Sequence, residues 1–207
     1  MGLNDFFPVL EDDRAMLRPL QMDDLHSLLP VALQDSLWKV GIQRISGEED
    51  LANYIRQAIR ERESGQSIPF LIIDKKNNCA AGSTRFGNIV FPHKRLEIGW
   101  TWIGEAFQGS GLNRHMKYLM LEHAFEAMEM NRVEIKTDVL NERSRRAILG
   151  LGAKEEGIFR SHMVTDTGRI RDTIYFSIIK EEWPEVKEGL RKKIRNERMK
   201  RMGKLLD

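Results

Sequence analysis

The chain has 207 residues, of which 41% are hydrophobic and 31% are charged, and its formal net charge is +2. This length suits one domain with short extensions, and the apolar content excludes a disordered chain. No apolar run approaches the roughly 18 residues that a transmembrane helix needs. The acidic residues 11–13 argue against a signal peptide. The single cysteine, Cys79, excludes an internal disulfide and a cysteine-based zinc site, so we expect a cytoplasmic protein.

The positive charge is concentrated at the C-terminus. Residues 191–204 hold eight basic residues and one acidic residue, a net of +7, so the rest of the chain carries −5. An acidic body disfavours nucleic-acid binding. The pattern from 183 to 204 predicts a helix, and Ile194 and Met199 are the apolar residues in the middle of its basic part. We therefore expect this part to be a solvated helix, dispensable for folding and turnover, with a tether to an acidic partner as the alternative.

The first part of the chain predicts one strand, two helices and a hairpin. Residues 15–19 form a short run suited to a strand. Apolar residues then recur at helical spacing from Met22 onward and again over 48–66, which predicts two amphipathic helices. Apolar runs at 70–73 and 80–91, separated by a polar turn, predict a β-hairpin.

The second part continues the alternation of strands and helices. We expect a strand at 96–102, a glycine-rich turn and a long helix within 109–126, a strand at 133–140, a short helix at 142–149, and strands at 155–164 and 169–179. This order predicts an α+β domain in which helices flank one mixed, mostly antiparallel sheet. The domain should span 15–182, with an N-terminal extension at 1–14 and a basic C-terminal helix at 183–207.

The segment 100–115 is the most informative about chemistry. A strand runs into a turn with glycines at 109 and 111, and a long helix follows. The first amides of a helix lack partners and attract anions, and glycine lets a phosphate approach the backbone. The third glycine of a dinucleotide-binding turn is missing, and so is the lysine of a P-loop. By itself the segment indicates either an anion site or a tight turn.

A second informative segment begins where the strand at 133–140 ends. Asn141 precedes a short helix, and Ser144 stands three positions later. Asparagine is a favoured N-cap residue, so capping alone would explain this pair.

Together these segments resemble the GNAT superfamily of acetyl-CoA-dependent N-acetyltransferases, over about residues 15–182. The family's pyrophosphate motif reads here Gln108-Gly-Ser-Gly111-Leu-Asn113. The Asn141 and Ser144 pair, the Leu-Gly-Ala at 151–153 and the later Arg171-Asp172 resemble the ribosomal-protein (RimJ/RimL-like) branch. Asn113 departs from the pattern, because the family usually has glycine or alanine there.

The resemblance implies a GNAT fold with a splayed central strand pair, and acetyl-CoA as cosubstrate without a metal. The backbone amides that would hold the pyrophosphate belong to Gln108, Gly109, Ser110, Gly111, Leu112 and Asn113. Trp102 and Ile103 would pair with the pantetheine arm, Asn141 would bond it, and Ser144 would lie near the sulfur. The splay between the strands at 96–102 and 133–140 would leave an amide to polarise the thioester carbonyl.

An acceptor amine must lose a proton and the leaving thiolate must gain one. Glu97, on the central strand, is the candidate base acting through water, and the alternative is a carboxylate that only binds a cation. Ser144 is the candidate proton donor, with Tyr118 and Tyr175 as substitutes. The five histidines show no metal-ligand spacing.

The expected activity is direct transfer of the acetyl group to a primary amine, either at a protein N-terminus or on a small molecule. The alternative is a non-catalytic acyl-CoA-binding module whose basic tail meets an acidic partner. The sequence leaves a homodimer open, and it indicates neither a membrane nor a nucleic acid as partner.

Overall fold

The computed structural model describes residues 9–40 and 44–203, with no side chains beyond Met199. One eight-stranded sheet forms its centre, in the order β1-β2-β3-β4-β5-β6-β8-β7. The strands are β1 (Leu10–Glu11), β2 (Ala15–Pro19), β3 (Ile68–Asp74), β4 (Cys79–Val90), β5 (Arg95–Ile103), β6 (Arg132–Asp138), β7 (Lys154–Val164) and β8 (Ile170–Ile179). The helices are α1 (Leu25–Ala32), α2 (Glu48–Glu63), α3 (Leu112–Glu122), α4 (Glu142–Leu151) and α5 (Trp183–Gly203). The expected mixed, mostly antiparallel α+β sheet is confirmed, since only β5 and β6 are parallel among its described neighbours.

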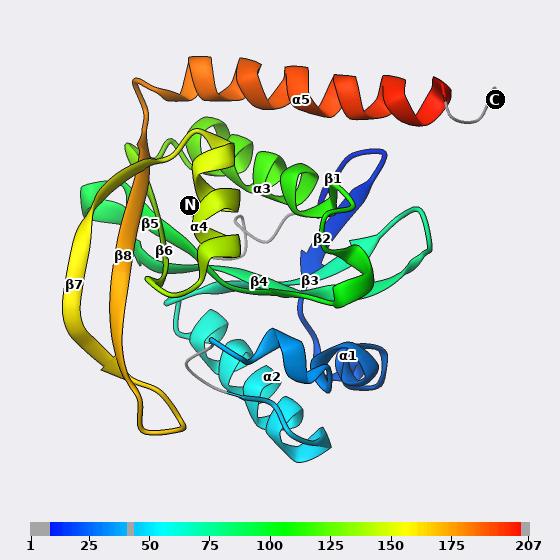
Figure 1. The fold of residues 1–207 in the computed structure, drawn as a ribbon, viewed down its shortest axis with the longest axis vertical. Coiled ribbons are helices and arrows are strands. Elements are labelled where there is room, and N and C mark those ends of the chain that lie inside the picture. The colour runs from blue at the N-terminus through cyan, green and yellow to red at the C-terminus, as the bar shows by residue number, and fades with distance from the viewer. Residues whose placement is uncertain (1–8, 41–43, 204–207) are drawn as a thin grey trace.

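The sheet is covered on both faces (Figure 1). Helices α3, α4 and α5 lie on one face, and α1 and α2 lie on the other. Each face has its own apolar cluster: Leu96, Ile98 and Met116 belong to the α3 side, and Trp102 and Ile55 to the α2 side. Because side chains of a strand alternate between the two faces of a sheet, Leu96 and Ile98 of β5 face α3. Trp102 faces α2.

Helix α3 follows a glycine-rich turn, as the sequence pattern predicts. The expected turn and helix cover 109–126, and α3 itself starts at Leu112. Gly109 and Gly111 have left-handed φ values of 69° and 90°, which no right-handed helix contains. The last turns are a π-helix at His123–Ala127. Strand β1 was not predicted, because its two residues are too few to display alternation.

Helix α5 packs against the body, so the expectation that the basic segment buries little is wrong. Ile194 is only 7% exposed and belongs to the α3-side core cluster together with Leu190. Arg191 Nε donates to Tyr118 Oη on α3 at 2.8 Å, and Glu197 pairs with Arg114 at the start of α3. No described helix is both long and apolar enough to cross a membrane.

Packing of α5 predicts a stability loss that a solvated helix would not show. We expect Ile194→Ala to lower the free energy of unfolding by about 2–4 kcal/mol, as for other large-to-small core substitutions. Met199→Ala, on the same helix but 65% exposed, is the matched control and should change little. Urea unfolding of both variants checks this, and equal stability of the two would show that α5 does not pack in solution.

Candidate active site

Strands β5 and β6 separate at the middle of the sheet. They pair from Arg95 opposite Arg132 to Glu97 opposite Glu134. Beyond these pairs β5 continues to Ile103 and β6 continues along its other neighbour, β8. The expected splay is therefore confirmed, and it leaves backbone groups of both strands open to a ligand.

A β-bulge in β5 lies at the splay. Ser83 and Arg85 of β4 stand opposite Trp102 and Gly99, so β5 has one extra residue in this interval. Trp100 adopts a left-handed φ of 50°, which is an outlier for a bulky side chain. A bulge leaves its extra residue outside the ladder and re-aims the neighbouring groups. The bulge thus presents irregular backbone where the two strands part.

The loop before α3 presents free amides. Within the described part of the chain, the amides of Gly109, Gly111 and Asn113 donate to no acceptor. The Gln108 side chain braces the loop, because its Nε2 donates to the Ile103 carbonyl at 2.9 Å. Arg143 of α4 donates to the same side chain, which brings an exposed cation beside the loop. Free amides, a helix N-terminus and this arginine suit an anion such as a pyrophosphate.

Glu97 lies on the α2 side of the sheet in a pocket of about 400 Å³. The residue is 3% exposed, and its carboxylate accepts from Asn88 Nδ2 at 2.7 Å and pairs with Lys136 Nζ at 2.9 Å. Gly99 keeps this side free, since a Cβ there would stand 2.7 Å from Glu97 Oε1. Tyr175 lines the same pocket. A carboxylate so placed can take a proton through water or hold a cation.

Lys117 is a buried lysine beneath the bulge, and it was not predicted from the sequence. It is 6% exposed, and its Nζ donates to Thr101 Oγ1 at 2.8 Å, which in turn lies 2.8 Å from Thr84 Oγ1. Burial lowers the pKa of Lys117 to about 7, although the charge of Glu97 opposes the decrease. The helical pattern alone offered no signal, because a lysine in an amphipathic helix usually reaches solvent.

The lowered pKa of Lys117 predicts a pH-dependent stability. Between pH 7 and about 10.4 the folded chain releases this proton while the unfolded chain keeps it, so stability rises with pH. We expect a slope contribution of up to about 1.4 kcal/mol per pH unit from this residue. Urea unfolding from pH 7 to 10 should show it in the wild type and not in Lys117→Met, whereas the exposed control Lys192→Met should keep it. A Lys117→Met slope equal to the wild-type slope would contradict the burial of a neutral amine.

Asn141 and Ser144 form a helix cap. Asn141 Oδ1 accepts from the Ser144 amide at 3.0 Å at the start of α4. The helix cap expected from the sequence is thus present. It uses the backbone amide of Ser144, so the Ser144 hydroxyl can still donate a proton. Of the two substitute donors, Tyr175 lines the Glu97 pocket. Tyr118 instead lies beneath α5, where it donates to Glu122 at 2.6 Å and accepts from Arg191.

Trp102 and Ile103 are the last two residues of β5 before the loop. The Trp102 ring packs on the α2 side against Trp38, with ring centroids 5.8 Å apart. The Ile103 side chain points to the α3 side. One backbone edge of this segment pairs with β4, and the other faces the splay because β6 has already departed. An extended ligand arm could pair there as an added strand.

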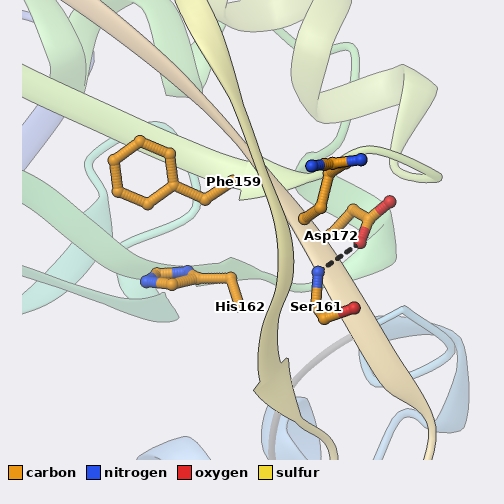
Figure 2. A pocket seen from close by; sticks show the side chains of 5 residues that line it. Phe159, Ser161, His162 and Asp172 are labelled. Carbon is orange, nitrogen blue, oxygen red and sulfur yellow. Dashed lines mark hydrogen bonds between the residues drawn. The ribbon is translucent and has the colours of Figure 1, made fainter.

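A bulge in β7 around Ser161 carries an exposed aromatic cluster near the Glu97 pocket. The Ser161 amide donates to Asp172 at 2.7 Å, while Phe159 and His162 point away from that bond (Figure 2). They line a shallow depression of about 790 Å³. The Phe159 ring lies 4.5 Å from that of Tyr175. Because Tyr175 also lines the Glu97 pocket, the two hollows adjoin.

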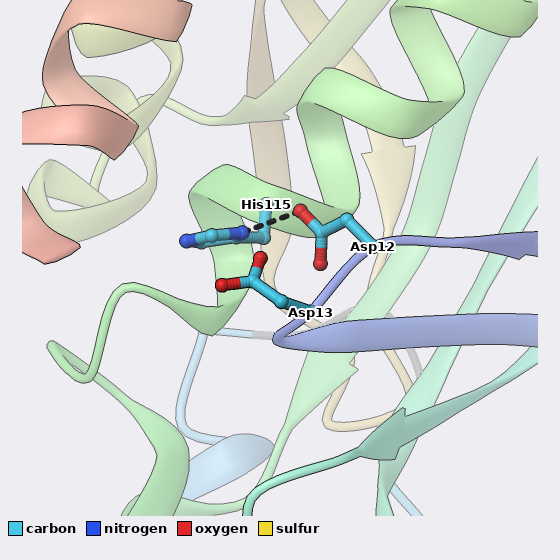
Figure 3. A group of neighbouring side chains, drawn as sticks. All are labelled: Asp12, Asp13 and His115. Carbon is cyan, nitrogen blue, oxygen red and sulfur yellow. Dashed lines mark hydrogen bonds and ion pairs between the residues drawn. The ribbon is translucent and has the colours of Figure 1, made fainter.

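Asp12, Asp13 and His115 gather at the β1–β2 turn and α3 (Figure 3). The sequence spacing suggested no such group, since 102 residues separate Asp13 from His115. Asp12 pairs with His115 Nδ1 at 2.5 Å and accepts from two backbone amides of its own turn. Burial would raise the pKa of Asp12, but these hydrogen bonds outweigh it and lower the pKa. Asp13 pairs with Arg198, so the cluster ties the first hairpin and α5 to α3.

Comparison with known proteins agrees with this geometry. A family model described as the acetyltransferase (GNAT) domain matches residues 14–154. N-acetyltransferase YoaA of Bacillus subtilis (strain 168) is 25% identical over 175 residues, which are 84% of this chain and 98% of the relative. The ribosomal-protein-serine acetyltransferase of Escherichia coli (strain K12) is 29% identical over 129 residues, 62% of this chain and 69% of the relative. The crystal structure of a GCN5-related N-acetyltransferase from Brucella melitensis is similar with a TM-score of 0.83 and 25% identity, covering 89% of this chain and 84% of that one. The family model spans well over half of the sequence, and the chain therefore belongs to the GNAT family of acetyltransferase enzymes, with RimJ/RimL-like relatives.

Proposed function

We propose that this enzyme transfers the acetyl group of acetyl-CoA directly to a primary amine, and that its acceptor is a protein N-terminus. The observation that carries the proposal is the splay between β5 and β6. It has an amide-lined loop at its open end and the Glu97 pocket where the strands come together. A ligand lying in the splay would present its reactive end to that pocket.

The chain's residues fit the phosphate and the arm of CoA. Gly111 at the helix start has a left-handed φ of 90°, which favours glycine. The loop amides between Gln108 and Asn113 would bind the pyrophosphate, and those of Gly109, Gly111 and Asn113 have no acceptor among the described residues. Trp102 and Ile103 would bond the pantetheine arm through their backbone, with Asn141 on the opposite side. Bound acetyl-CoA supplies a thioester, whose carbonyl the backbone of the β5 bulge would polarise.

Two side chains would move protons. Glu97 would take the proton of the acceptor ammonium through water, and Ser144 would supply one to the leaving sulfur. Lys136 and Asn88 hold the Glu97 carboxylate in one orientation, at 2.9 and 2.7 Å. A fixed orientation favours proton transfer, because less entropy is lost when the base reaches the reactive geometry.

Three observations support a protein N-terminus over a small amine. The Glu97 pocket and the adjoining depression are open, and exposed Phe159 lines the depression, so a peptide chain has a surface on which to lie. The E. coli relative is named a ribosomal-protein-serine acetyltransferase. The pocket also mixes Glu97 and Glu134 with Arg95 and Lys136, so it lacks the acidic character that a polyamine would need.

An acetyl-CoA turnover screen that reports free thiol tests the proposal against peptides, ribosomal proteins and small amines. We expect turnover with free peptide N-termini and none with N-terminally blocked copies. Turnover with small amines and not with peptides would show that the acceptor is a small amine and not a protein N-terminus. Tight acetyl-CoA binding without turnover on any amine would instead indicate a non-catalytic acyl-CoA-binding module.

A further inference from the structure

Arg171 is a buried arginine whose Nε has no hydrogen-bond partner among the described residues. The residue is 6% exposed, and the Nε atom is itself buried. Its described ion pair, to Asp138, is long at 3.9 Å. Asp138 is already engaged by Arg169 and by the Leu140 amide. The hydroxyl of Thr173, fully buried two residues further on, also has no hydrogen-bond partner within the residues that the structure describes.

Such a group calls for a ligand. A buried N–H donor is nearly always satisfied in native proteins, and the Nε–H of Arg171 is buried without a partner among the described residues. Here two arginines share one buried carboxylate, so the cluster carries an excess positive charge that Asp138 alone does not neutralise. Burial accordingly lowers the pKa of Arg171, against the attraction of Asp138. An oxygen atom of a carbonyl or carboxylate would complete the site.

The site opens on the acceptor side of the sheet. Arg171, Thr173 and Tyr175 are every second residue of β8, so their side chains lie on the same face of the sheet. Tyr175 lines the Glu97 pocket. Thr173 stands opposite Asp138, the last residue of β6, so Arg171 lies at the wide end of the splay. The charge of Glu97 reaches Arg171 across this gap and acts on its pKa. Two opposite charges thus flank the position where an acceptor amine would react.

We propose that Arg171 binds the carbonyl or carboxylate oxygen next to the reactive amine of the acceptor, with Thr173 beside it. The enzyme would then select α-amines, as in peptides, over simple alkylamines. This inference rests on the proposed function. Arg171 could equally bind a carbonyl of the pantetheine arm, so the experiment must distinguish binding of the acceptor from binding of acetyl-CoA.

The test compares tetraalanine, which has a carbonyl beside its amine, with ethylamine, which has none. We expect Arg171→Met to lower kcat/KM for tetraalanine by about 10- to 100-fold, the loss typical of hydrogen bonds to a charged group. Turnover of ethylamine and the calorimetric Kd for acetyl-CoA should stay at wild-type values. Arg171→Lys keeps the charge but loses the planar fork, so an intermediate loss on tetraalanine is expected. Arg171→Lys also provides the test if Arg171→Met does not fold.

Arg169→Met is the matched control, because it removes the arginine that is already hydrogen-bonded to Asp138. It should leave the ratio of the two acceptors unchanged. Equal losses on both amines in the Arg171 variants would overturn the selection of α-amines, and a weaker acetyl-CoA Kd would assign Arg171 to the pantetheine arm instead. A wild-type enzyme that acetylates neither amine nor any peptide would refute the proposed function and this inference with it.

Discussion

Glu97→Gln should lower kcat/KM by about 100-fold or more at pH 7 while the affinity for acetyl-CoA is retained, because a positioned base typically contributes ~10²–10⁴ in rate. Glutamine keeps the shape of the side chain and can still bond Asn88, but it cannot accept the proton. An acceptor amine with a pKa of ~8 to ~10.4 is mostly protonated at pH 7. The deficit should therefore shrink as the pH rises towards the pKa of the amine, where free amine accumulates unaided. Steady-state kinetics from pH 6 to 9 measure this.

Glu134→Gln is the matched control for Glu97→Gln. Glu134 lines the same pocket and faces Glu97 across the strand pair, but it is held by Arg132 at 2.9 Å. We expect its pH profile to follow the wild type. Near-normal activity of Glu97→Gln across the range would make Glu97 a structural partner of Lys136. A loss that does not vary with pH would instead indicate that the carboxylate binds the substrate.

Gly111→Val should abolish measurable acetyl-CoA binding while the chain stays folded. A branched side chain at a φ of 90° would shift the loop and fill the space that a phosphate needs. Each charge-assisted amide bond contributes about 1.5–3 kcal/mol, so losing two of them weakens binding by about 100-fold or more. Isothermal titration calorimetry with acetyl-CoA checks the affinity, and circular dichroism checks the fold.

The backbone strain of this variant needs its own control. Gly168, in the turn between β7 and β8, also has a left-handed φ, of 79°, and no atom stands within 4 Å of the position its Cβ would take. Gly168→Val therefore carries a similar strain away from the loop, and it should bind acetyl-CoA as the wild type does. Undiminished affinity in Gly111→Val would remove the loop from the CoA site.

The order of elements and the place of the loop could be predicted from sequence. Apolar residues recur with period two over 96–102 and at helical spacing over 48–66, and these periods report the buried face directly. The resulting strands and helices agree with β5 and α2 to within a few residues. The segment from Gln108 to Asn113 combines glycines with a following helix, so local chemistry predicted either an anion site or a tight turn, and the resemblance to the GNAT motif favoured the anion site. Glu97 became the candidate base because it lies on a central strand, and this role stays a prediction.

The surroundings of individual charges were decided only by the tertiary structure. Lys117 is buried because Thr101 and Thr84 of the bulged sheet lie beneath it. Arg171 Nε stays 3.9 Å from the Asp138 oxygen that is hydrogen-bonded to Arg169. Ile194 is buried because α5 folds back over α3, far from it in the chain. The sequence by itself determined which residues can form each element, through local periodicity and backbone preference. Solvation and pairing of a charge depend instead on atoms contributed by distant segments, and no local pattern encodes them.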